Sequence, residues 1–80
     1  MTHDEILSQL QPVFQQVFDD ASIQVARGTT AADVEGWDSL THIQLIAAVE
    51  KHFGVKFKLG EIMKFKNVGD LVDCVAKHKG

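Results

Sequence analysis

The stretch from Asp38 to Gly54, DSLTHIQLIAAVEKHFG, has the pattern of one complete helix with both ends marked. Asp38 is of a type that caps helix N-termini, and Gly54 can take the left-handed conformation that ends a helix. Lys51 and His52 complement the carbonyl end of the helix dipole. The stretch therefore predicts a helix from Asp38 through Phe53. Its inward side chains are expected to be Leu40, Ile43, Ile46, Ala47, Val49 and Phe53, with Leu45 near the edge of that stripe.

A first helix is predicted upstream, between Ile6 and Phe18, where apolar residues recur at spacings of three and four. Thr2 and Glu5 offer a capping box at its start. Pro12 removes one backbone hydrogen bond, so we expect either a bend there or loosely formed first turns. The inward stripe of this helix comprises Ile6, Leu7, Leu10, Val13, Phe14, Val17 and Phe18.

Downstream, the pattern predicts a short third helix over residues 60–65 and a last helix that begins after Asn67. Asn67 with Asp70 three residues later resembles a helix cap. Residues 19–37 lack periodicity, and we expect a long loop that its own apolar side chains pin to the bundle. The fold class is therefore all-α, with three main helices and one short helix. The expected inward residues are Ile23, Val25 and Val34 in the loop and Val68, Leu71, Val72, Val75 and Ala76 in the last helix.

Composition predicts one domain over residues 1–80, because 80 residues with 45% hydrophobic and 24% charged content are typical of a single soluble unit. A net charge of -3 argues against a nucleic-acid binder, which needs a basic surface. No stretch reaches the roughly 20 apolar residues of a membrane span, and the start of the chain lacks the pattern of a signal peptide, so we expect a cytoplasmic protein. We also expect it to be a monomer. Cys74 has no second cysteine to pair with and is expected to be an inert thiol in the core.

The residues Gly36-Trp37-Asp38-Ser39-Leu40 place a serine at the first position of a helix, directly after a glycine that allows a sharp turn. We expect the Ser39 hydroxyl to face solvent and Leu40 to be buried. Free backbone amides and the positive end of the helix dipole would stabilise a phosphate attached there by about 0.3 to 1 kcal/mol. Taken alone, a serine near a helix start is also explained by capping.

The sequence around Ser39 resembles the motif-bearing helix of the acyl carrier protein family, which includes stand-alone carriers and the carrier domains of polyketide and peptide synthetases. The resemblance covers nearly the whole chain, because the long loop, the short third helix and the Asn67-capped last helix follow the family's order. It implies an acyl-carrier-like four-helix bundle. The residues that carry it are Asp38, Ser39, Leu40, Ile43, Leu45, Ile46, Val49, Glu50, Phe53, Gly54 and Val55.

The resemblance implies that Ser39 receives a covalent 4'-phosphopantetheine arm from coenzyme A. A phosphopantetheinyl transferase would attach it and would read a surface that includes Asp38 and Leu40. The thiol of the arm would hold an acyl group as a thioester and present it to acyl-loading and acyl-processing enzymes of fatty-acid, polyketide or other specialised biosynthesis. Catalysis would belong to those partners, so the chain itself is not an enzyme. The expected partner-contacting residues are Thr41, His42, Gln44 and Leu45.

The bundle of this family can open a cleft for an acyl chain. Ordinary core packing explains the apolar residues at the matching positions equally well. These cleft candidates are Val49, Phe57, Ile62, Phe65, Leu71 and Cys74.

The surface of this chain departs from that of carriers in general fatty-acid synthesis, which are strongly acidic along the motif helix and the helix after it. Here Thr41, His42 and Gln44 occupy positions where those carriers frequently have acids. Because complementary charge selects partners, the departure argues against docking by an acidic helix onto a basic patch. The run from Gly36 to Leu40 resembles that of carriers dedicated to specialised acyl or aminoacyl pathways. Four lysines surround the predicted short helix: Lys56, Lys58, Lys64 and Lys66.

Two alternatives remain open on the sequence. Ser39 and His42 lie three residues apart on one helix, as in a hydrolase pair, but no orienting group or oxyanion site is evident. A helical interaction module without any modification also fits the composition. Trp37 is expected to anchor the loop on the bundle. No metal site is expected, because the four histidines are too scattered: His3, His42, His52 and His78.

Overall fold

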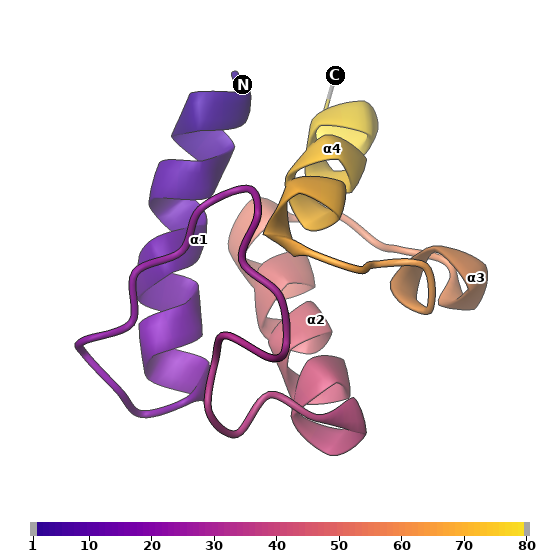
Figure 1. The fold of residues 1–80 in the computed structure, drawn as a ribbon. Coiled ribbons are helices and arrows are strands. Elements are labelled where there is room, and N and C mark those ends of the chain that lie inside the picture. The colour runs from indigo at the N-terminus through magenta and orange to yellow at the C-terminus, as the bar shows by residue number, and fades with distance from the viewer. Residues whose placement is uncertain (1, 80) are drawn as a thin grey trace.

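The computed structural model describes residues 2–79 and contains only helices and loops over that range. The helices are α1 (His3–Val17), α2 (Ser39–Phe53), α3 (Leu59–Ile62) and α4 (Val68–Lys79). Figure 1 shows α1, α2 and α4 gathered in a bundle, with the one-turn helix α3 set to one side of it. The predicted all-α class, with three main helices and one short one, is confirmed. No described helix has both the length and the apolar character needed to cross a membrane.

The first helix begins at the predicted capping box. The Glu5 amide donates to Thr2 Oγ1 at 3.1 Å, and the Thr2 amide donates to Glu5 Oε1 at 3.0 Å. The helix continues through Pro12 as one element, so its first turns are formed. The buried side chains of α1 follow the predicted stripe and are Ile6, Leu10, Val13 and Phe14.

Both ends of α2 also form as predicted. Asp38 Oδ1 accepts hydrogen bonds from the amides of Leu40 at 2.9 Å and Thr41 at 3.0 Å. Gly54 ends the helix in the left-handed region, with φ 68° and ψ 36°. These ends were predictable because each depends on a few neighbouring residues.

The buried face of α2 differs from the prediction. Leu45 is fully buried, whereas Leu40 is 70% exposed and Ile43 is 54% exposed. Ala47, also expected inside, is exposed. This helix is apolar around most of its circumference, so its periodicity does not select one face, and packing against the rest of the bundle does. The observed inward residues are Leu45, Ile46, Val49 and Phe53.

The long loop before α2 is pinned to the bundle, as predicted. Val25 and Val34 are buried. The loop also docks on the start of α4 through main-chain atoms, since the Val68 amide donates to Thr29 O at 2.8 Å and the Gly69 amide donates to Arg27 O at 2.8 Å. Figure 1 shows this loop crossing the face of the bundle between α1 and α2. The loop therefore has a defined path although it contains no helix.

The last helix begins at its predicted cap, where the Asp70 amide donates to Asn67 Oδ1 at 2.9 Å. The short helix α3 covers Leu59–Ile62, which is earlier and shorter than the predicted 60–65. Glu61 explains the shift, because its carboxylate accepts the Lys58 amide at 2.9 Å and caps the turn from within. The buried residues of α4 include the predicted Val68, Leu71, Val72 and Val75.

Candidate functional site

Ser39 is the first residue of α2, and its side chain is exposed. The chain reaches it through a tight turn in which Gly36 has φ 88°, a value that favours glycine. Thr41 Oγ1 donates to Gly36 O at 2.7 Å and accepts from the Asp38 amide at 2.8 Å, so one hydroxyl ties the turn to the helix. Ser39 is therefore exposed to solvent on a turn that these hydrogen bonds hold to the helix.

The electrostatics at this helix start differ in one respect from the prediction. We expected free backbone amides at this helix start, but the amides of Leu40 and Thr41 donate to the carboxylate of Asp38. The hydrogen bond from the Thr41 amide makes the largest contribution to lowering the pKa of Asp38, so the residue that caps the helix is an ionised carboxylate. A phosphate on Ser39 would experience the helix dipole next to this negative charge rather than a set of free amides.

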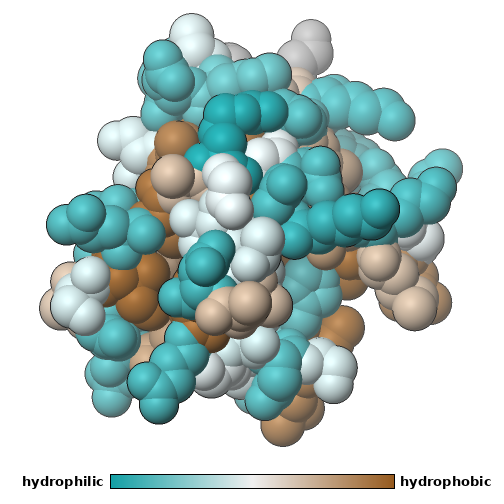
Figure 2. All heavy atoms as spheres, viewed as in Figure 1, coloured by the Kyte–Doolittle hydropathy of each residue, from teal (hydrophilic) through white to brown (hydrophobic). Residues whose placement is uncertain are grey.

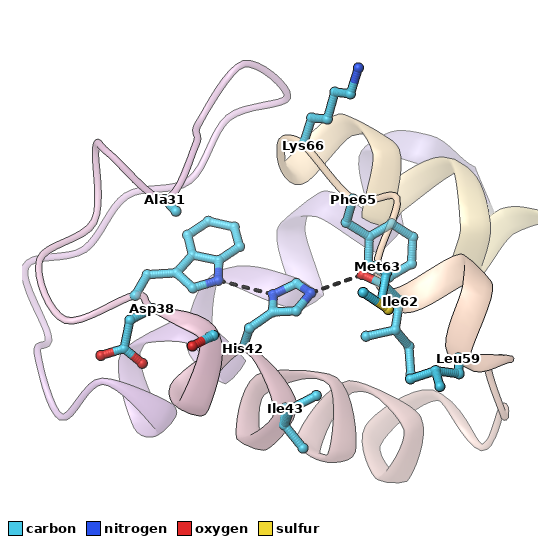
Figure 3. Close-up of a pocket in the computed structure, with 11 residues that line it drawn as sticks. Ala31, Asp38, His42, Ile43, Leu59, Ile62, Met63, Phe65 and Lys66 are labelled. Carbon is cyan, nitrogen blue, oxygen red and sulfur yellow. Dashed lines mark hydrogen bonds between the residues drawn. The ribbon is translucent and has the colours of Figure 1, made fainter.

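An apolar groove of about 480 Å³ opens directly beside Ser39. Its lining comes from the loop before α2, the first turns of α2, α3 and the segment that follows α3 (Figure 3). Figure 2 shows tan and brown spheres at the right of the molecule, where α3 lies in Figure 1. Leu59 and Met63 are 67% and 78% exposed, so this apolar surface is open to a ligand or partner. The lining residues are Ala31, Trp37, Asp38, Ser39, His42, Ile43, Leu59, Ile62, Met63, Phe65 and Lys66.

One histidine bridges the two sides of the groove. Trp37 Nε1 donates to His42 Nδ1 at 3.1 Å, and His42 Nε2 lies 3.0 Å from Ile62 O (Figure 3). Because the carbonyl can only accept, Nε2 carries the ring proton. The Trp37 ring also packs edge-on against Phe14, with the two ring centroids 5.3 Å apart, which confirms the predicted role of the indole as a loop anchor.

This bridge decides against the Ser39 and His42 hydrolase pair. A general base needs a free lone pair within hydrogen-bonding reach of the nucleophile, and His42 Nδ1 already accepts from Trp37. The other ring nitrogen faces Ile62 O. In this structure His42 therefore joins the loop before α2 to α3.

The residues predicted to contact partners differ in how accessible they are in the structure. Leu45 is fully buried, so its assignment as a partner contact is wrong. The Thr41 hydroxyl is engaged in the helix cap, and His42 is half-buried in the bridge. Gln44 is exposed. The exposed Ile43 was missed as a surface residue because apolar side chains on a helix are assigned to the core by default. Leu40, which its spacing placed inward and the resemblance placed on the surface read by the transferase, is exposed.

Of the residues predicted to line an acyl cleft, some line the groove beside Ser39 and others lie in the core. Ile62 and Phe65 line the groove beside Ser39. Val49, Phe57 and Leu71 are instead packed in the hydrophobic core, so the structure does not bring them to the groove. The missed lining residues come from three separate segments, which no local pattern connects: Ala31, Ile43, Leu59 and Met63.

Residues 8–75 match the family described as "Phosphopantetheine attachment site". The helical bundle and this match define a carrier domain whose prosthetic group is a covalently attached phosphopantetheine. An exposed serine beside an apolar groove fits such a group, because a hydroxyl is the attachment point and apolar walls suit its aliphatic segments.

Individual proteins that the chain resembles include acyl carrier proteins and a polyketide synthase. The chain is 30% identical over 76 residues to an acyl carrier protein of Acidothermus cellulolyticus, covering 95% of this chain and 90% of that protein. It is 32% identical over 73 residues to a non-reducing polyketide synthase of Emericella nidulans, covering 91% of this chain and 3% of that protein. The solution structure of the holo acyl carrier protein of Geobacter metallireducens superposes with a TM-score of 0.85 at 53% identity, covering 91% of this chain and 84% of that one.

The chain belongs to the acyl carrier protein family. An acyl carrier protein is a carrier rather than a catalyst.

Proposed function

We propose that Ser39 is the residue that holds the phosphopantetheine arm. The observation that carries the proposal is the position of its exposed hydroxyl at the first residue of α2, at the edge of the apolar groove. Ser8 and Ser22 are also exposed, but Ser8 lies within α1 and the hydroxyl of Ser22 hydrogen-bonds Asp20 at 2.6 Å. Neither of them lines the groove, so Ser39 has the better placement.

The residues around Ser39 would orient the arm and its cargo. When attached, the group supplies a thiol that holds an acyl chain as a thioester. Ile43, Leu59 and Met63 offer an apolar surface against which the arm or its acyl chain can lie. The flexible arm raises the effective concentration of cargo at each partner enzyme. The carrier therefore contributes presentation and partial shielding, and the chemistry occurs on the partners.

We propose further that the partners are a phosphopantetheinyl transferase and the enzymes of a specialised acyl pathway. Asp38 and Leu40 flank Ser39 and are exposed, as a transferase contact requires. The first two turns of α2 contain no acidic residue, so a partner that recognises an acidic helix would find little charge there. Four exposed lysines near α3 instead favour a partner with an acidic rim: Lys56, Lys58, Lys64 and Lys66.

Mass spectrometry tests the attachment site. The unmodified chain is incubated with coenzyme A and a broad-specificity transferase, and we expect it to gain the mass of one phosphopantetheine group on the peptide that contains Ser39. Ser39→Ala should fold normally and gain nothing, while Ser8→Ala should be loaded like the parent chain. Loading of Ser39→Ala at another serine, or no loading of the parent chain, would contradict the proposal.

A further inference from the structure

Three side chains that can ligate a metal converge between α3 and α4. The Cys74 thiol donates to Glu61 Oε2 at 3.3 Å, and His78 Nε2 lies 3.1 Å from the same oxygen. One ligand atom from each residue lies within 4.8 Å of the other two. Within residues 2–79, no second group of this kind is found. The function described above uses none of the three.

The fold holds these residues in a suitable arrangement. Cys74 and His78 lie four residues apart on α4 and therefore share one face of that helix. Glu61 faces them from α3, and its second oxygen accepts the Lys58 amide at 2.9 Å. A hydrogen bond of this kind orients a carboxylate in the way that outer-shell partners orient metal ligands. A groove of about 480 Å³ lined by Glu61 and Cys74 gives an ion access from solvent.

The ligand set and its spacing suit zinc. Zinc binds thiolate at about 2.3 Å and imidazole or carboxylate at about 2.0 to 2.2 Å, so its tetrahedral ligands lie about 3.4 to 3.6 Å apart. The distances from Glu61 Oε2 to Cys74 Sγ and His78 Nε2, 3.3 and 3.1 Å, are already close to that spacing. We propose that Glu61, Cys74 and His78 bind a divalent ion of the zinc class, with water as the fourth ligand.

In the metal-free site, hydrogen bonds from Cys74 and His78 to Glu61 connect the three side chains, and an ion would replace the shared protons. Burial, and then the adjacent Glu61 carboxylate, raise the pKa of Cys74 to about 12, so the free thiol is protonated at neutral pH. On binding, the S–H bond of Cys74 breaks, a metal–sulfur bond forms and the proton passes to water. In the metal-free chain His78 Nε2 faces the Glu61 carboxylate; on binding, the Nε2 proton would move to Nδ1 and Nε2 would donate its lone pair to the ion.

Nearby charges act in both directions on such an ion. Lys64, Lys66 and Lys77 line the adjacent groove and repel a cation, although Lys77 also favours the thiolate form of Cys74. Asp70 and Asp73 line the same groove and offset that repulsion. The local charge therefore permits binding and leaves selectivity to the thiolate and imidazole, which suit zinc better than magnesium or calcium.

Metal binding would affect the groove beside Ser39. Helix α3 has one turn, and its Leu59 and Ile62, with Met63 after it, form one wall of that groove. An ion that joins Glu61 to α4 would hold this wall in place. Because Ser39 is not among the ligands, the inference is independent of where the arm is attached.

Cobalt titration of the unmodified full chain tests the site. Cys74 is the only cysteine of the sequence, so a thiolate-to-cobalt charge-transfer band reports this residue alone. We expect one cobalt ion per chain, displaced by zinc. Cys74→Ser should lose the band, and His78→Gln should weaken zinc binding at least about a hundredfold, since loss of an outer-shell partner alone costs about 10 to 100-fold. His52→Gln, a histidine on α2, should bind zinc like the parent chain.

Amide NMR spectra of the parent chain provide a second readout that needs no variant. Zinc should shift resonances of α3 and of the C-terminal half of α4 and leave α1 unchanged. The proposal is overturned if no thiolate band forms, if His78→Gln binds zinc as tightly as the parent chain, or if the shifts are confined to other helices.

Discussion

The indole N–H of Trp37 and Nδ1 of His42 are joined by a hydrogen bond of 3.1 Å. Since His42 also contacts Ile62 O at 3.0 Å, one ring connects the loop before α2 to the segment that forms α3. The planes of the two rings differ by only 18°, and their centroids are 6.0 Å apart, so the rings lie side by side and nearly coplanar. The wall of the groove that faces Ser39 therefore depends on two side chains that do not themselves react.

Removal of the Trp37 ring should destabilise the bundle. We expect Trp37→Ala to lower the free energy of unfolding by about 2 to 3 kcal/mol, because the half-buried indole packs on Phe14. Trp37→Phe keeps an aromatic ring but loses the bond to His42 and should cost about 1 kcal/mol. Urea unfolding followed by circular dichroism measures both, and equal losses would show that packing on Phe14 is unimportant.

A methyl group at Gly69 should disturb the contact between the loop and α4. Its Cβ would lie 3.0 Å from Arg27 O and 3.2 Å from Asn67 Oδ1. We expect Gly69→Ala to lose about 1 kcal/mol of stability, although alanine in a helix is otherwise favoured by about that amount. At Gly60 in α3 an added Cβ meets no atom within 4 Å, so Gly60→Ala should be neutral or stabilising. Thermal unfolding of both variants measures the two effects. A stabilised Gly69→Ala would mean that the loop yields easily.

Acid should weaken the link between α3 and α4. The Lys58 backbone N–H, followed by the Cys74 thiol and then His78, lowers the pKa of Glu61 from 4.5 to about 2. A lowered pKa in the folded state means that the contribution of Glu61 is complete above pH 4.5 and is lost as the pH falls toward 2. The stability difference between the parent chain and Glu61→Gln should therefore shrink between those pH values.

Urea unfolding of both proteins at several acidic pH values measures that difference. Glu35→Gln, at an exposed loop position, controls for the change in net charge. A difference that stays constant from pH 5 to pH 2.5 would contradict the assignment of Glu61 as the cap of α3.

The Cys74 thiol should react slowly in the folded chain. Burial first, and then the Glu61 carboxylate, raise its pKa from 9.0 to about 12, which lowers the thiolate fraction at neutral pH by at least about a hundredfold. A chromogenic disulfide reagent applied to the unmodified chain measures the rate, and the same reaction in denaturant is the control. Rapid labelling of the folded chain would show that this helix face opens readily.

The features that the sequence predicted are those that a few neighbouring residues determine. Each helix cap depends on hydrogen bonds between residues that are close in the sequence. The helix ends predicted in this way are those at Thr2 with Glu5, Asp38, Gly54 and Asn67. The resemblance to acyl carrier proteins, which rests on the residues around Ser39, is likewise confirmed at the level of the family.

The features that the sequence did not predict depend on contacts between distant segments. The buried face of α2 was assigned to Leu40 instead of Leu45, because an apolar helix has no single preferred face until its neighbours are known. The groove and the Glu61, Cys74 and His78 cluster both require α3 to be placed against other elements. The spacing of Cys74 and His78 by four residues was a visible signal, but the third member came from a different helix.

The backbone contact between the loop and α4 has a consequence for how such carriers can diversify. Thr29 and Arg27 hold the loop to α4 through carbonyl oxygens, which every amino acid possesses. The exposed side chains of this segment can consequently change in evolution while its course over the bundle is preserved, provided that the buried Val25 and Val34 are kept. A carrier built in this way can acquire new surface chemistry ahead of Ser39 without redesigning its scaffold.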